Sequence, residues 1–218
     1  MKIVSQILVL IFLVLTGCKG EKKYHDVKTK NALVQKDKRI TDILEFQNTL
    51  NLEFKDSETS PLPDRFRKDF ESLEFFAPDT NYIVRAKFNR TPDAVPFLMP
   101  TTTDRESEEV VYGTVHFSLN DNNYTLEIYQ NPELVLQEKY KNYLFLPFTD
   151  KTNGYMTYDG GRYLDLEIPQ GDVIVLDFNK AYNPYCAYNK KYSCPLVPPV
   201  NHIETKISAG VKSFKPNG

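Results

Sequence analysis

Carboxylate, guanidinium, amide and phenol side chains concentrate between residues 147 and 201 of this chain. Asp150, Asp165 and Asp177 each lie at or near the end of a strand-like run, with Arg162 beside them in sequence. A carboxylate within the apolar run Val173–Phe178 needs a partner, because burying an unpaired charge is expensive. An arginine fork can hold a carboxylate through two parallel hydrogen bonds. We therefore expect Arg162 to meet Asp177, with Asp150 in the same cluster.

Two interpretations of these polar groups remain open. In the first, Asp150, Arg162 and Asp177 form a buried network that pins the long loops. In the second, the polar groups line a pocket for a small anionic or polar ligand, with Tyr158, Tyr163 and Tyr182 as walls. The candidate ligand-binding residues are Asp150, Arg162, Tyr163, Asp165, Asp177, Asn179, Tyr182 and Asn183.

Two further classes of function compete with ligand binding. A hydrolase could use Asp150, Asp165 and Asp177 with Arg162, whereas an interaction module could dock a partner through the Tyr-rich loop 182–192. The chain has no Gly-x-Ser-x-Gly elbow and only three His, which disfavours a Ser-His-Asp site. Paired carboxylates for glycoside hydrolysis stay open, because their separation is invisible in sequence. No cofactor is indicated.

The N-terminus has the features of an export signal. Lys2 is followed by the apolar run Ile3–Leu15, and small residues precede Cys18. A charged start, a short apolar stretch and a small-residue cleavage site are typical of a secretory signal. The sequence Leu-Thr-Gly-Cys resembles a bacterial lipobox, which implies a signal peptide over residues 1–17 and a lipid on Cys18. We expect residues 18–30 to be a polar tether, and the protein to be exported and held on the membrane of the bacterial cell envelope, on its periplasmic or outer face.

Two further cysteines, Cys186 and Cys194, are eight residues apart. In an exported protein the simplest outcome is a disulfide, and the lipid on Cys18 leaves an even number of thiols. Free or redox-active thiols are an alternative. A metal site that adds His202 is another, although the spacing matches no recognised zinc pattern.

Composition limits the remaining classes. The 218 residues carry 27 basic and 29 acidic side chains, and the net charge of -2 excludes a broadly basic nucleic-acid binder. The 14 Tyr and 14 Phe indicate a packed interior. Residues 31–218 are long enough to form one domain with its own core.

The pattern of residues 31–218 predicts a mainly β domain, an antiparallel sandwich or barrel with one or two N-terminal helices. Ile40, Ile43 and Leu44 have helical spacing, with Thr41 or Asp42 as the expected cap, and a second helix is expected at Asp64–Leu73. Residues 104–109 are expected to be a solvated loop, 120–123 a turn and 169–172 a hairpin loop. Strands are predicted at Tyr82–Phe88, Val111–Leu119, Tyr124–Tyr129, Tyr143–Phe148, Arg162–Ile168, Val173–Phe178 and His202–Ile207.

Four blocks carry a family resemblance. They read Pro-Phe-x-Asp-x-Thr-x-Gly at 147–154, Thr-Tyr-x-x-Gly-Arg-Tyr at 157–163, Asp-Phe-Asn-x-Ala-Tyr-Asn-Pro-x-Cys-Ala-Tyr at 177–188 and Cys-Pro-x-x-Pro-Pro-x-Asn at 194–201. Over about residues 40–212 the chain resembles the bacterial and archaeal family labelled domain of unknown function 1684. Met156 and Val211 stand where that family commonly has Glu, so the resemblance supports no acid role there. It locates a site and implies no reaction.

Overall fold

The structure, a computed structural model, describes residues 37–215. By its internal contacts the chain divides into residues 1–36 and residues 37–218. The expected signal peptide at 1–17, the lipid site Cys18 and the tether at 18–30 lie outside the described residues. Within 37–215, no helix is both long enough and apolar enough to cross a membrane.

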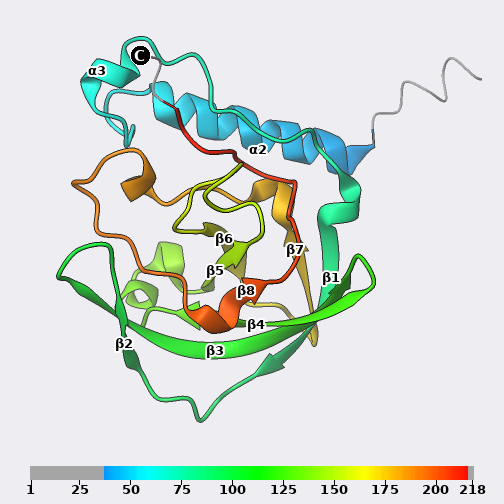
Figure 1. The fold of residues 1–218 in the computed structure, drawn as a ribbon. Helices are drawn as coiled ribbons and strands as arrows, with labels where there is room; N and C mark the ends of the chain where they lie inside the picture. The colour runs from blue at the N-terminus through cyan, green and yellow to red at the C-terminus, as the bar shows by residue number, and fades with distance from the viewer. Residues whose placement is uncertain (1–36, 216–218) are drawn as a thin grey trace, which may run out of the picture. The chain divides into compact units, whose positions relative to one another are not determined.

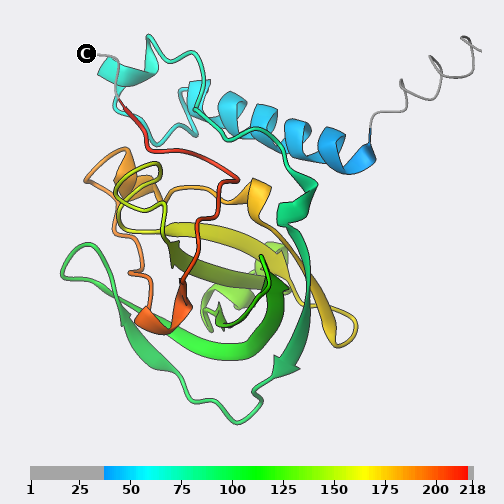
Figure 2. The same cartoon turned by 45° about the vertical axis from the view of Figure 1, so that its right-hand side comes forward.

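Eight strands form one sheet that nearly closes into a barrel (Figures 1 and 2). The order β6-β5-β4-β3-β1-β7 is antiparallel throughout, β2 pairs with β3, and the short β8 runs parallel to β5. The predicted mainly antiparallel, barrel-like fold with an N-terminal helix is therefore confirmed. The strands are β1 Ile83–Arg90, β2 Phe97–Pro100, β3 Glu106–Leu119, β4 Asn122–Gln130, β5 Tyr143–Asp150, β6 Arg162–Glu167, β7 Val173–Asp177 and β8 His202–Ile203.

The two predicted chain reversals have different outcomes. Between β3 and β4, Asn120 and Asp121 both have positive φ (50° and 62°), which is the geometry of a tight hairpin turn. The hairpin predicted at 169–172 is wrong, because β6 pairs with β5 while β7 pairs with β1. Those two strands stand at opposite ends of the strand order, so the loop spans the seam where the barrel nearly closes.

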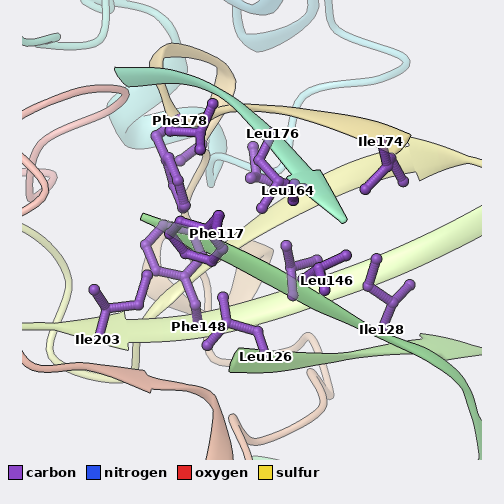
Figure 3. Close-up of a cluster of buried hydrophobic side chains, with 14 of the residues drawn as sticks. Phe117, Leu126, Ile128, Leu146, Phe148, Leu164, Ile174, Leu176, Phe178 and Ile203 are labelled. Atoms are coloured by element: carbon purple, nitrogen blue, oxygen red, sulfur yellow. The ribbon is translucent and has the colours of Figure 1, made fainter. Parts of the chain in front are cut away.

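The barrel core follows the two-residue period of the strands. Leu126, Ile128, Leu146, Phe148 and Leu164 point into one apolar cluster (Figure 3). The intervening residues of these strands face outward, and some of them build a second cluster on the outer wall. That cluster contains Met99, Tyr129, Phe145, Tyr163 and Cys194.

Helix α2 spans Lys38–Lys55 and lies over one end of the barrel in both views (Figures 1 and 2). Asp37 caps it by accepting a hydrogen bond from the Arg39 backbone N–H, so the predicted caps at Thr41 and Asp42 are wrong; both lie inside the first turns. Helix α3 covers only Asp64–Arg67 rather than Asp64–Leu73. Beyond α3 the chain is tied to α2, since the Leu73 N–H donates to the Asn51 side chain.

The start of β3 corrects a second expectation. Residues 104–109 are not a solvated loop, because β3 begins at Glu106 and both Ser107 and Glu109 are buried. The strand β2, which the sequence did not reveal, covers this part of β3. The predicted last strand shrinks to two residues. Short 3-10 helices occupy the connections at Thr80–Tyr82, Leu134–Leu136, Glu138–Tyr140, Phe178–Lys180, Tyr185–Ala187 and Pro199–Asn201.

Candidate functional site

Strand β6 divides the predicted site residues between the two faces of the barrel wall. Arg162 and Leu164 point inward, whereas Tyr163 and Asp165 point outward. Two clusters of polar groups result, one buried at the end of the barrel and one on its outer wall. They differ in what surrounds them.

The buried cluster centres on Arg162, which is fully buried. Its Nη2 donates to Asp150 Oδ2 at 2.8 Å and to the Ile207 carbonyl at 2.9 Å, and its Nη1 donates to the Ala209 carbonyl. Its guanidinium carbon lies 5.3 Å from the Phe148 ring centroid. Burial lowers the pKa of Arg162, and the Asp150 charge opposes that shift.

The other oxygen of Asp150 accepts from two backbone groups, the N–H of Thr152 at 2.8 Å and that of Ile207 at 3.1 Å. Together, Asp150 and Arg162 fasten the C-terminal segment 207–211 to β5 and β6. The pair therefore has the contacts of a structural network, in which main-chain groups bind Asp150 and both Nη atoms of Arg162, while Arg162 Nε is buried without a hydrogen-bond partner.

The expected contact between Arg162 and Asp177 is not formed. Asp177 Oδ1 accepts from the backbone N–H of Asn179 at 3.1 Å and from its Nδ2 at 2.9 Å. The reason is strand parity: in β7, Ile174 and Leu176 fill the core, so Asp177 belongs to the opposite face. Asn179 in turn binds both backbone groups of Asp79, which ties the 3-10 helix Phe178–Lys180 to the residue before the 3-10 helix Thr80–Tyr82.

Two more asparagines fasten loops. Asn183 is buried, and its Nδ2 donates to the Lys212 carbonyl at 2.9 Å and the Tyr188 hydroxyl at 3.3 Å. Asn201 accepts from the Glu127 N–H and donates to the Glu127 and Pro147 carbonyls, all at 2.7–2.8 Å. Asn179, predicted to bind ligand, is thus engaged by the protein itself through both amide atoms, whereas Asn183 is engaged through Nδ2 and its buried Oδ1 has no hydrogen-bond partner.

The outer cluster centres on Asp165. Its Oδ1 accepts from the hydroxyls of Tyr143 at 2.8 Å and Tyr182 at 2.6 Å. Tyr182 is positioned by a backbone bridge to Tyr163, with N–H to carbonyl distances of 2.9 and 3.1 Å in the two directions. Burial, followed by the Asp165 charge, raises the pKa of both Tyr143 and Tyr182 well above the usual range, so both phenols stay protonated.

Three clefts meet around this outer cluster. The largest, about 950 Å³, contains Tyr143, Asp165 and Asp177. A second, about 430 Å³, contains Tyr143, Tyr163, Tyr182 and Glu109. A third, about 420 Å³, lies between α2 and residues 182–195 and contains Tyr163, Asp165 and Tyr182. Volumes of this size suit small-molecule ligands.

A buried carboxylate belongs to the second cleft. Glu109 is 4% exposed and accepts from Ser107 Oγ at 2.9 Å and from Asn131 Nδ2 at 3.4 Å. Burial raises its pKa, and these two hydrogen bonds and the charge of Arg105 oppose the shift. Arg105 and Glu133 also line this cleft, which places one cation and two carboxylates on its wall.

Cys186 and Cys194 lie against each other as free thiols, and the Cys186 N–H contacts Cys194 Sγ at 3.2 Å. The hydrogen bond with Cys194 lowers the pKa of Cys186 to about 6, and Tyr158 assists from 3.9 Å. Tyr158 therefore contacts a thiol and is not among the residues around the three clefts. His202 binds Thr149 and Glu204 instead. Within 37–215, no three His, Cys, Asp or Glu side chains gather as a metal site.

Comparison with known proteins gives a family. The profile of the family described as a protein of unknown function, DUF1684, matches residues 68–212. The chain belongs to the DUF1684 family. It is also similar to an uncharacterised protein from gene locus rrnAC0354 of Haloarcula marismortui, solved by solution NMR, at 33% identity and a TM-score of 0.62. That match covers 86% of this chain and 97% of the other. No curated protein matches.

The DUF1684 blocks quoted above divide between fastening and cleft formation. Asp150, Arg162, Asn179, Asn183 and Asn201 hold loops and strands together. Tyr163, Tyr182 and Pro195 belong to the cleft walls. Many residues of the family blocks thus serve to hold the end of the barrel closed.

Several residues around the clefts were missed by the sequence reasoning. Tyr143 opens β5 outside the blocks, and Glu109 and Arg105 come from the stretch interpreted as a loop. The outward parity of Tyr143 relative to the core residues Leu144 and Leu146 was a usable signal for the first. For Glu109 the sequence holds no comparable signal, because residues 106–109 are all polar and the β3 register shifts between Val111 and Gly113.

Proposed function

We propose that this chain is an exported lipoprotein, anchored to the bacterial cell envelope through a lipid on Cys18, that binds a small polar ligand on the outer wall of its barrel. The proposal of an anchor rests on the N-terminal sequence alone: Lys2, the apolar run Ile3–Leu15 and the small residues before Cys18. Incorporation of a radiolabelled fatty acid tests it. The wild type is expected to take up label, whereas Cys18→Ser takes up none; equal labelling would contradict the anchor.

The observation that carries ligand binding is the position of Asp165. One carboxylate oxygen is held by two tyrosine hydroxyls, and this held group faces the largest cleft and the cleft beside α2. A carboxylate oriented in this way by its neighbours is suited to receive a donor group from a ligand. The Asp150–Arg162 pair does not face any of the three clefts. Its two side chains bind each other and main-chain groups instead.

A ligand-dependent thermal-shift screen of the full-length chain in a non-ionic detergent tests the binding proposal. A ligand that binds only the folded state raises the melting temperature. The shift is expected to vanish in Asp165→Asn and to persist in Asp93→Asn, which changes an exposed aspartate away from these clefts. Equal loss of the shift in both variants, or no shift with any compound, contradicts the proposal.

The two competing classes receive less support. A hydrolase using the Asp/Arg cluster would lack Arg162, which is buried against residues 207–211, and would retain only Asp165 and Asp177 in one cleft. An interaction module docking through 182–192 would need exposed aromatic rings. Of the four tyrosines in that loop, Tyr185 alone is exposed, at 39%, while Tyr182 and Tyr192 are half-buried and Tyr188 is buried.

The cysteine pair is proposed to become a disulfide in the export compartment. The Cys186 thiolate would attack a disulfide of a partner oxidant, and Cys194 would then displace the partner's thiol, so that two electrons and both thiol protons leave this chain. A mass two hydrogens lower in protein isolated from the envelope, restored by reductant, is the expected result. An unchanged mass would contradict the disulfide.

A further inference from the structure

We propose that the cleft between α2 and residues 182–195 binds a small organic ammonium ion. This inference deepens the proposed ligand-binding function and rests on it. The cleft has about 420 Å³, enough for a molecule of a few heavy atoms with its hydration partly removed. Its walls combine aromatic rings with carboxylates, which is the combination that recognises organic cations.

The aromatic rings come from two parts of the chain. Phe46 lies on α2, while Tyr163 and Tyr182 belong to β6 and the segment bridged to it, with ring centroids 5.9 Å apart and planes at 87°. Tyr185 and Tyr192 add a second pair, with centroids 5.2 Å apart. Rings at these angles present faces and edges in several directions, so that a cation in the cleft can meet a negative ring face.

The charge of this cleft has one sign. Its ionised wall residues are Glu53 of α2 and Asp165 of β6, and among residues 37–215 no Lys, Arg or His lines it. The largest cleft differs, since Arg39, Lys139 and Lys180 also line that one. An anion entering the cleft beside α2 would therefore meet two carboxylates and no compensating cation, whereas an ammonium ion would be attracted.

The tyrosines reinforce this preference. Burial raises the pKa of Tyr163, Tyr182 and Tyr185, so that their rings stay neutral and keep the electron-rich faces that attract cations. Lys191 does not line the cleft, but its Nζ lies 4.9 Å from the ring centroid of its sequence neighbour Tyr192. The proposed contacts with the ammonium ion therefore belong to Phe46, Tyr163, Tyr182 and Tyr185.

A metal ion fits this cleft poorly. Hard cations need several oxygen ligands converging on one point, and the two carboxylates come from different elements with aromatic rings around them. An organic ammonium ion needs no such convergence, because rings and a single carboxylate stabilise its diffuse charge together. The ammonium group could belong to a free amine or to a lipid headgroup, and the test separates these sources.

Calorimetric titration of the full-length chain, in a non-ionic detergent, measures binding of three probes. Choline carries the cation, dimethylbutanol is its neutral carbon isostere, and phosphocholine adds the phosphate of a lipid headgroup. We expect choline to bind at least about tenfold more tightly than dimethylbutanol. Tighter binding of phosphocholine than choline would assign the headgroup as the source, and weaker binding would assign a free amine.

Variants locate the site. Phe46→Leu and Glu53→Gln are each expected to weaken choline binding several-fold. Phe46 lines this cleft and not the largest one, whereas Glu53 lines both and lies on an exposed face of α2, so its change leaves the fold intact. Tyr140→Leu, a tyrosine of the neighbouring largest cleft, is the matched control and should bind choline as the wild type does.

Equal affinity for choline and dimethylbutanol, or no binding of choline, would overturn the inference. So would equal loss of choline binding in Tyr140→Leu. If compounds of the thermal-shift screen then still depend on Asp165, the ammonium inference alone has failed. If no compound of that screen depends on Asp165, the proposed ligand-binding function has failed with it.

Discussion

Arg162 and Asp165 are three residues apart on the same strand, and they have opposite surroundings. Arg162 points into the barrel end, where Asp150 and the carbonyls of residues 207 and 209 accept hydrogen bonds from its two Nη atoms. Asp165 points outward, where two tyrosine hydroxyls hold one oxygen beside open clefts. Both are charged residues of the same densely polar region. The difference shows that polar residues can be concentrated in a sequence block for two reasons. Some of them hold the strands and loops of the fold together, and others are available to bind a ligand.

Removing Arg162 should give the largest effect. Arg162→Met leaves the buried Asp150 carboxylate without its cation, and breaking a buried pair in this way costs about 3–5 kcal/mol. Urea unfolding of the full-length chain measures the change. Asp165→Asn is the matched control on the outer wall and should cost less than about 1 kcal/mol. Similar losses in both variants would remove the distinction between the two clusters.

A second change tests the closing network away from the charges. Asn201→Ala removes three hydrogen bonds and leaves the Glu127 and Pro147 backbone groups buried without partners, at a cost of about 1–3 kcal/mol. Asn122, the exposed first residue of β4, is the control, and Asn122→Ala should change the free energy of unfolding by less than about 0.5 kcal/mol. Wild-type stability in Asn201→Ala would show that the block at 194–201 is retained for something other than closure.

The thiols of Cys186 and Cys194, on the outer wall, are expected to differ in reactivity. The Cys194 hydrogen bond lowers the pKa of Cys186 to about 6, while that same contact raises the pKa of Cys194. Alkylation of the reduced protein by iodoacetamide should therefore modify Cys186 first, with a rate that rises through about pH 6 and levels off above it. Mass spectrometry of tryptic peptides locates the label. Equal rates at both cysteines, rising only at alkaline pH, would contradict this asymmetry.

The smallest effect is expected at Glu109. Burial raises its folded-state pKa, so the folded state holds the proton more tightly than the unfolded chain. Stability from this group is present at low pH and is lost as the pH rises from the unfolded value through the folded one. Glu109→Gln should therefore be more stable than the wild type at neutral pH, and the gap should shrink towards pH 4. A gap that widens on acidification would contradict the assigned direction.

The sequence predicted the barrel because short strand-like runs, several of them alternating, follow one another with turns between them. The runs at 111–119, 124–129 and 143–148 lie within β3, β4 and β5, and the Asn-rich turn was confirmed by its positive φ angles. Strand β2 and the first residues of β3 were missed because charged residues there looked like a loop. Pairing with β2 decides that segment, and such long-range pairing leaves no local signature.

The sequence predicted which segments contain the candidate site residues, but it did not predict which of those residues lie together. Applying the two-residue period to β6 and β7 would have separated Arg162 from Asp165 and Asp177, since Leu164 and Leu176 mark the inward positions. The partner of Arg162 follows from the same rule: Asp150 shares the inward parity of Phe148, the residue opposite Arg162. That Asn179 and Asn183 hold backbone groups 100 and 29 residues away could not be inferred, because it depends on how the loops fold back.

Amide chemical-shift mapping of the full-length chain against a fragment library tests most directly which cluster faces a ligand. The account predicts that fragments shift the amides of Tyr143, Asp165, Tyr182 and Tyr185 and leave those of Asp150 and Arg162 unchanged. Shifts gathered at Asp150, Arg162 and residues 207–211, with the outer wall silent, would contradict it.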